Sequence, residues 1–503
     1  MIAVGLLRWF LNMQREEIQL LFYARGTNIS TGEISNLSEE FLLRFYALHK
    51  NHNEAMSSFF EKNGGMILHL DGTGEAGDDI VFTAMDGRTG IKIDSQIMPS
   101  ESRESIKPFL RNLKKSIGEP IAIIRDMSKN IKDAASEIFP KTPHLICHYH
   151  FVSNLGKLIF KEDYESLRKN MVSTRILGQL LSLKGKLPNP ASNQSILVQA
   201  ECKWVAVAIE YLLMPREQPS GFPFVLPYYE IMNRMLEIRD LIKRIIDWNA
   251  ENNMAVNSIL DLHENVEKLM QYDEIKKQYM ILGKIWNWFE AMRKILAVSR
   301  HLKDDGQKNE LNTAADIRND LQKLIEELEM ESKRNDRKLR SVSKIIISEC
   351  RQHWEELTGD IQDKNGNDVR IVRHNGIVEN NHRWSRMHSR RRTGRSRTTN
   401  DMAKYGALTA ILSNLENEIY VNGILKDVID LVFEISRITQ EEIKEARKLI
   451  KPFHNEFLIS SDSKRFTLLK DFVTILEQTE QKNKIDVRKW LNELECANPL
   501  MTP

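Results

Sequence analysis

The chain has 503 residues, which at roughly 150 residues per domain predicts about three domains. It contains only 23 glycines and 14 prolines, so a turn-rich all-β protein is excluded and long helices are expected. The 72 Lys and Arg residues nearly balance the 70 Asp and Glu residues, and the resulting net charge of +2 does not by itself indicate a nucleic-acid partner.

Residues 1–62 are predicted to be helical, because apolar residues recur there at every third or fourth position. Gly26 interrupts this pattern, residues 31–36 indicate a short helix, and Ser38 stands where the N-cap of a second helix is expected. The arrangement fits a helix-turn-helix DNA-binding region and a plain helical hairpin equally well.

Residues 63–157 contain short apolar runs instead, which are typical of buried strands. The expected strands are 66–71, 79–85, 90–98, 120–126 and 144–151, and the expected helices are 102–117 and 130–139. The resulting order, β-β-β-α-β-α-β, predicts a mixed sheet. A doubly wound sheet is excluded, because it needs a crossover helix directly after its first strand.

Residues 158–368 are predicted to form an all-helical insertion. Within it, 301–350 holds ten basic and eleven acidic residues beside an apolar stripe, which favours a solvated helix or a short coiled coil. Residues 369–430 are assigned to a second part of the core, and 431–503 to a helical C-terminal region. The predicted fold class is therefore α+β and mostly α: a mixed β-sheet core interrupted by a large helical insertion, with helical ends.

Two aspartates close predicted strands. Asp71 and Asp126 each end a buried apolar run, at the position where open sheets place their ligand chemistry. Two carboxylates at one place repel each other, and a bound Mg²⁺ relieves this repulsion. The alternative is that both are turn formers, with Asp71 preceding Gly72 and Asp126 capping toward Ser128.

Arginines are concentrated around a single glutamate. Residues 373–397 hold eight arginines and one acid, Glu379, which in a structural interpretation is simply a salt-bridge partner. In a helix, Glu379 shares a face with arginines spaced four, three and four residues apart. Because such a block repels itself unless phosphates neutralise it, we expect contact with DNA or RNA. The expected DNA-binding residues are Arg383, Arg386, Arg390, Arg391, Arg392, Arg395 and Arg397.

Taken in order, these residues resemble the DDE transposases of the insertion-sequence and Mutator-like type. The resemblance is carried by Asp71, Asp126, the segment from Cys147 to His150, and the pattern Asn-x-x-x-Glu-x-x-His-Arg-x-x-Arg that begins at Asn375. It covers residues 66–157 and 371–400, and the helical gap only in type and position. The resemblance implies an RNase H-like catalytic domain interrupted by a helical insertion.

The resemblance also implies the activity. It assigns Asp71, Asp126 and Glu379 as a catalytic and metal-binding triad, which in physical terms can hold two Mg²⁺ or Mn²⁺ ions about 4 Å apart for in-line phosphoryl transfer. The implied protein is a DNA transposase that binds terminal inverted repeats, cleaves strands and joins 3′ ends to target DNA. Its implied partners are the double-stranded DNA of transposon ends and target, and a second copy of itself in a homodimer or larger oligomer.

Two alternatives stay open at this point. One is a domesticated or decayed transposase that binds DNA without catalysis. The other is a helical scaffold that dimerises through residues 311–345. Either would lack the strand-transfer chemistry that the triad implies.

Cys147 and His150 form half of a zinc-site pattern. Zn²⁺ needs four ligands and no second Cys/His pair has suitable spacing, so we expect a packed cysteine and a hydrogen-bonded histidine near the active site instead of zinc. Four cysteines do not make a disulfide framework, and no run approaches the ~18 apolar residues that span a bilayer. We therefore expect a cytoplasmic, nucleoid-associated protein with no membrane partner.

Overall fold

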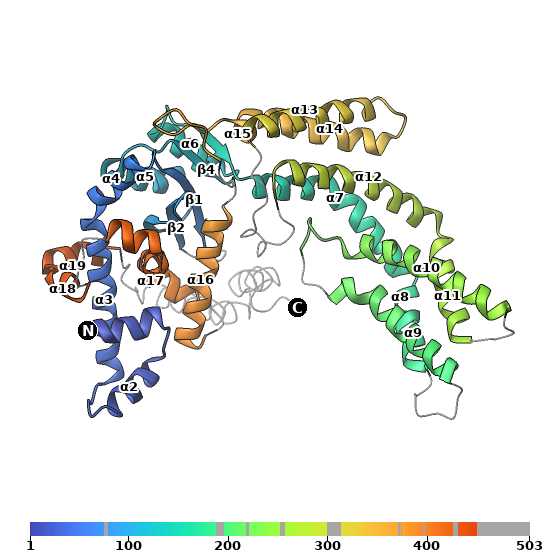
Figure 1. Ribbon diagram of the computed structural model, residues 1–503, viewed down its shortest axis with the longest axis horizontal. Coiled ribbons are helices and arrows are strands. Elements are labelled where there is room, and N and C mark those ends of the chain that lie inside the picture. Colours follow the sequence, from blue (N-terminus) through green and yellow to red (C-terminus); the bar gives the residue numbers. More distant parts are fainter. Residues whose placement is uncertain are drawn as a thin grey trace, which may run out of the picture.

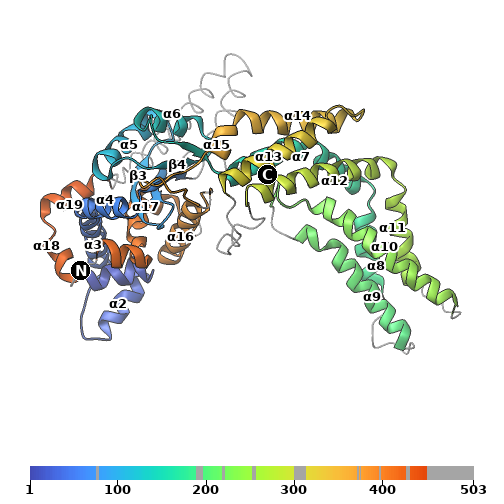
Figure 2. The ribbon, with the colours of Figure 1, turned by 45° about the horizontal axis from the view of Figure 1, so that its top comes forward.

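The computed structural model (Figure 1) has two parts, a body built around a small β-sheet and a curved arm of helices that extends from it. Figure 2 shows the same division after a turn of 45°. The residues that the structure describes are 1–74, 79–187, 196–217, 221–251, 257–298, 313–370, 373, 375–395, 398–425 and 431–449. Arg397 and most of the expected C-terminal region therefore lie outside the described residues.

The N-terminal segment is helical, but its helices differ from those expected. They are α1 (Ile2–Gly5), the π-helix η1 (Leu6–Phe10), α2 (Arg15–Tyr23), α3 (Thr31–Asn51) and α4 (Asn53–Lys62). The expected second N-cap at Ser38 is wrong, since α3 is continuous and begins after the N-cap Ser30. The Ser38 hydroxyl instead donates to the carbonyl of Ser35 within the helix, so it caps nothing.

The sheet is mixed and five-stranded, as the element order predicts. Its strands are β1 (Ile67–Thr73), β2 (Ile80–Asp86), β3 (Lys92–Met98), β4 (Ala122–Arg125) and β5 (His144–Ile146), in the order β3-β2-β1-β4-β5. β2 pairs antiparallel with β1 and β3, whereas β4 pairs parallel with β1 and β5. The last strand is shorter than the expected 144–151, because α7 begins at His148 directly after it.

The sheet shares one hydrophobic core with helices from both ends of the chain. β1 contributes Leu68 and Leu70, and the helices α5 (Arg103–Ile117) and α6 (Lys129–Ile138) contribute Phe109 and Ile131. The same core includes Phe41 of α3 and residues of the C-terminal helices. Residues 1–62 therefore contribute to the core of the body, and they also form a small apolar cluster of their own from Val4, Ile18, Ile29 and Ile34.

The described part of the arm consists of helices joined by turns and has a second hydrophobic core. We call α7 to α15 the helical arm. Its elements are α7 (His148–Ser173), α8 (Ile176–Lys186), α9 (Ile196–Leu213), η2 (Met214–Glu217), α10 (Pro227–Glu251), α11 (Asn257–Met270), α12 (Asp273–Ile295), α13 (Ala314–Glu331), α14 (Arg337–Gln352) and α15 (Trp354–Thr358). The described part of the apolar stripe in 311–345 is buried in this core, from Ile317 to Leu328, so it offers no surface for the dimer of the scaffold hypothesis.

The chain returns to the body after the arm. α16 (Gly376–Thr393) lies beside the sheet in both views and is followed by α17 (Thr399–Leu412), η4 (Ser413–Glu416), η5 (Tyr420–Ile424), α18 (Leu431–Arg437) and α19 (Gln440–Arg447). The whole is therefore α+β and mostly helical. Within the described part of the chain, no helix combines the length and apolar character needed to cross a membrane.

Candidate active site

Asp71 and Asp126 lie side by side where the pairing of the neighbouring strands β1 and β4 ends. β1 and β4 are parallel neighbours, and their last paired residues are Leu70 and Arg125, so the next residue along each segment is an aspartate: Asp71 within β1 and Asp126 just after β4. Side chains in register on adjacent strands point to the same face and lie about 5 Å apart. The register therefore brings the two predicted carboxylates together.

Glu379 approaches the same place from α16, more than 250 residues later in the chain. Burial raises the pKa of Asp71 well above its usual range, and the nearby negative charges of Glu379 and Asp126 raise it further. The Asp71 side chain is only 8% exposed, so water screens this repulsion weakly. The charges of Glu379 and Asp126 thus both act on Asp71.

A fourth carboxylate, Glu101, joins them and was missed by sequence reasoning. Its negative charge contributes to the raised pKa of Asp71, and its own pKa is raised by burial and by Asp126. The Glu101 carboxylate lies directly against Gly72, where a Cβ atom would collide with it. The available signal was topological: β3 runs parallel to β1, so the segment after β3 reaches the same edge of the sheet as Asp71.

Two of the carboxylates have orienting partners. Asp126 Oδ1 accepts a 2.8 Å hydrogen bond from the backbone N–H of Ser128, so the turn-forming interpretation holds for one of its oxygens. Glu379 Oε1 lies 3.3 Å from Nε2 of His150, which projects from α7. The histidine of the Cys-x-x-His segment therefore contacts the predicted glutamate directly.

Asn375 fastens the start of α16 to the sheet. Its side-chain amide donates to the carbonyl of Leu70 at 2.9 Å, its side-chain oxygen lies 3.1 Å from Nδ1 of His69, and its backbone N–H donates to Cys147 Sγ at 3.1 Å. All three groups are buried. Burial raises the pKa of the Cys147 thiol to about 12, so this sulfur serves here as a packed, neutral acceptor. These contacts set the position of Glu379, one helical turn further on.

The predicted DNA-binding arginines of α16 and of the residues just after it differ in exposure. Arg383, Arg390, Arg391 and Arg395 are exposed, whereas Arg386 is half-buried and donates to the Thr73 hydroxyl at the end of β1. Arg392 differs from the prediction of a DNA contact: it is 3% exposed, pairs with Asp401 and lies over the ring of Trp9. A guanidinium in that position cannot reach a phosphate, so Arg392 has a structural role.

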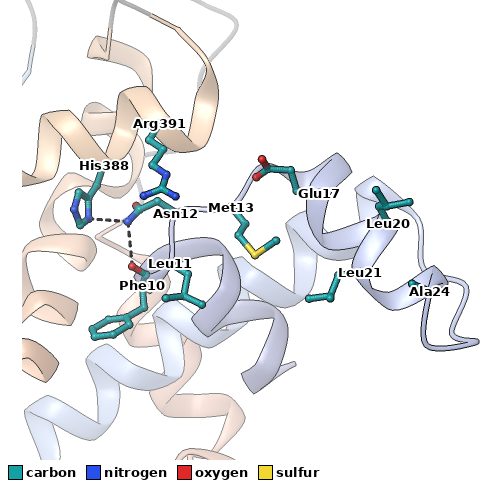
Figure 3. A pocket seen from close by; sticks show the side chains of 10 residues that line it. All are labelled: Phe10, Leu11, Asn12, Met13, Glu17, Leu20, Leu21, Ala24, His388 and Arg391. Atoms are coloured by element: carbon teal, nitrogen blue, oxygen red, sulfur yellow. Dashed lines mark hydrogen bonds between the residues drawn. The ribbon is translucent and has the colours of Figure 1, made fainter.

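The N-terminal helices meet the exposed side of α16 at a pocket of about 830 Å³ (Figure 3). Leu11, Leu20 and Leu21 line one side of it, and His388 and Arg391 of α16 line the other. Nδ2 of Asn12 donates to Nδ1 of His388 at 2.8 Å, across the junction. The N-terminal helices and the arginine-bearing helix therefore form one continuous surface.

The donor set fits a hard divalent cation by its chemistry. Carboxylate oxygens are the preferred ligands of Mg²⁺ and Mn²⁺, and a cation would relieve the repulsion that raises the pKa of Asp71. Among the described residues, however, no three or more His, Cys, Asp or Glu side chains are gathered closely enough to hold a metal ion as they stand. The Glu379 side chain is in contact with His150 at the same time.

Comparison with known proteins adds one finding. A family model described as the MULE transposase domain matches residues 81–154, from β2 to the start of α7. The matched segment contains Glu101, Asp126 and the Cys147–His150 segment, whereas Asp71 and Glu379 lie outside it. No curated protein matches the chain. The match supports a transposase role.

Proposed function

We propose that the protein is a DNA transposase of a mobile insertion element, which binds terminal inverted repeats and catalyses metal-dependent strand cleavage and strand transfer. The observation that supports the proposal is the electrostatic interaction of Asp71 with Glu379 and Asp126 beyond the paired ends of β1 and β4, in a chain whose residues 81–154 match a transposase domain. The sheet order, with three antiparallel strands followed by two parallel ones, supports an RNase H-like core.

Asp71, Asp126 and Glu379 would hold the metal, two Mg²⁺ or Mn²⁺ ions in the proposed form. Bound there, the ions would supply activation of a water or 3′-hydroxyl nucleophile and stabilisation of the leaving oxygen. The residues of the chain have the complementary task of placing these oxygens. The backbone N–H of Ser128 orients one carboxylate oxygen of Asp126, and His150 contacts the carboxylate of Glu379.

The exposed arginines of α16 would hold the DNA. Glu379, Arg383 and Arg390 follow one another along the same helix, so phosphates bound by the two arginines would lie close to the Glu379 carboxylate. Arg386 contributes positive charge closer to the acids while bonded to Thr73. The DNA would be the transposon ends and the target, and because two ends must be joined, we propose a homodimer or larger assembly.

A strand-transfer assay with the sequences that flank the gene tests the proposal. Asp71→Asn, Asp126→Asn and Glu379→Gln should each abolish cleavage and joining while DNA binding persists. Glu264→Gln, which removes an exposed carboxylate on the arm, is the matched control and should retain activity. Binding by the wild type without any cleavage in Mg²⁺ or Mn²⁺ would favour the alternative of a domesticated or decayed transposase, a non-catalytic DNA-binding protein.

A further inference from the structure

A buried ion pair joins the helical arm to the strand that carries Asp126. The side chain of Arg125, the last residue of β4, is 1% exposed, and its Nη2 lies 2.5 Å from Oε1 of Glu356. Glu356 belongs to α15, the last helix of the arm. The charge of a guanidinium buried this deeply requires a partner, and the partner comes from a segment more than 200 residues away.

Glu356 is itself held from two further directions. Lys132 of α6 lies 2.8 Å from Oε1, and Nδ1 of His353 lies 2.9 Å from Oε2. Burial raises the pKa of Glu356, but these hydrogen bonds and the charge of Arg125 outweigh it and hold the value at about 2. The carboxylate is therefore ionised and fixed between the body and the arm.

The next residue of α15, Leu357, is also anchored. The carbonyl of Leu357 lies 3.1 Å from Nε2 of His148 and accepts a 3.2 Å hydrogen bond from Nη1 of Arg373. His148 is the first residue of α7 and Arg373 precedes α16. α15 thus sits where the two chain segments that connect the arm to the body meet.

Arg125 connects the anchored helix α15 to Asp126. Its Nη1 donates a 2.9 Å hydrogen bond to the carbonyl of Asp126, while Nη2 pairs with Glu356. The Asp126 carboxylate is in turn oriented by the N–H of Ser128. One guanidinium therefore connects a helix of the arm with the backbone of the proposed catalytic residue.

We propose that Arg125 and Glu356 are positioning residues that make the placement of Asp126 depend on the seating of the helical arm. The inference rests on the proposed function for the consequence in catalysis. Neither residue is proposed to touch DNA or metal. The arm then has a role at the active site as well as any role in binding.

Two variants separate positioning from simple stabilisation. Arg125→Lys keeps a positive charge beside Glu356, but a single ammonium on a flexible stem does not hold both Glu356 and the Asp126 carbonyl in one geometry. Arg125→Met/Glu356→Leu replaces the pair by apolar residues, which a fold often tolerates well. The matched control is Arg239→Met/Glu267→Leu, which removes an ion pair of 2.5 Å within the arm.

Two readouts are measured in variants whose thermal unfolding matches the wild type. The first is strand transfer, for which we expect kcat to fall at least tenfold in both Arg125 variants, with the KM for DNA unchanged. The second is hydrogen exchange at the Ser128 amide, which should become at least tenfold faster, because the turn around Asp126 loses its support. The control should change neither.

The inference is overturned if the Ser128 amide exchanges at the wild-type rate in both variants, or if kcat is unchanged while exchange accelerates. If the wild type shows no strand transfer at all, the proposed function fails, and hydrogen exchange alone then decides whether the arm positions Asp126. Should either variant unfold, the other carries the test.

Discussion

Arg392 is expected to stabilise the fold and to make no contact with DNA, and replacing it with methionine tests this. Its side chain is buried, pairs with Asp401, and places its guanidinium 4.1 Å from the centre of the Trp9 ring. Arg392→Met removes the charge but retains an unbranched, polarisable side chain over the tryptophan. What is lost is chiefly the cation opposite Asp401.

The structure sets the size of the effect. Removing one partner of a buried ion pair typically costs about 3–5 kcal/mol, because the other charge is left alone. Asp401 is 15% exposed and keeps a 2.7 Å hydrogen bond from the Ser389 hydroxyl, so we expect the lower end, about 3 kcal/mol. Urea unfolding measures this as a lower midpoint with an unchanged slope. Arg391→Met, exposed on the same helix, is the matched control and should change stability by less than about 0.5 kcal/mol.

A second substitution strengthens the test. Arg392→Met/Asp401→Asn should recover part of the lost stability, because it removes the unpaired carboxylate. If Arg392→Met instead unfolds like the wild type and lowers the slope of log K for DNA against log salt by about 0.9, Arg392 contacts a phosphate and the reasoning from burial is wrong.

Three further predictions follow from the same structure. Arg391→Gln/Arg395→Gln should leave urea unfolding unchanged and reduce the salt slope of DNA binding by about 1.8, measured by fluorescence anisotropy; an unchanged slope would exclude both as phosphate contacts. Asn375→Ala should lower the free energy of unfolding by about 1–3 kcal/mol, because the buried groups bonded to its amide lose their partner; an unshifted urea midpoint would contradict this. The pKa of Glu356 lies below its unfolded value of 4.5, at about 2, so its stabilisation is complete above pH 4.5 and is lost as the pH falls to about 2. The stability difference between wild type and Glu356→Gln should therefore shrink by about 3 kcal/mol over that range, and a constant difference would refute the assignment.

Much of the body could be predicted from local pattern. Short apolar runs indicated the strands that bear Asp71 and Asp126, because burial on both faces of a sheet leaves a direct compositional trace. The spacing of Glu379, Arg383 and Arg390 likewise indicated one face of a helix, and α16 is a helix. These features depend on neighbours in sequence, which a single chain displays.

Features that depend on distant partners could not be predicted in this way. Arg392 resembles its exposed neighbours in sequence, and only the approach of Trp9 and Asp401 buries it. Glu101 follows no apolar run, so its place beside Asp71 emerges only from the sheet order. Serine is a common N-cap residue, but the packing of α3 against the body keeps the helix continuous through Ser38.

The central claim is that Asp71, Asp126 and Glu379 act together on a divalent metal. Titration with Mn²⁺, followed by the electron paramagnetic resonance of the free ion, tests this directly and needs no knowledge of the DNA ends. The account predicts that the wild type binds Mn²⁺ and that Asp71→Asn, Asp126→Asn and Glu379→Gln each weaken binding at least tenfold, whereas Glu264→Gln does not. Equal Mn²⁺ affinity in the wild type and all three site variants would contradict it.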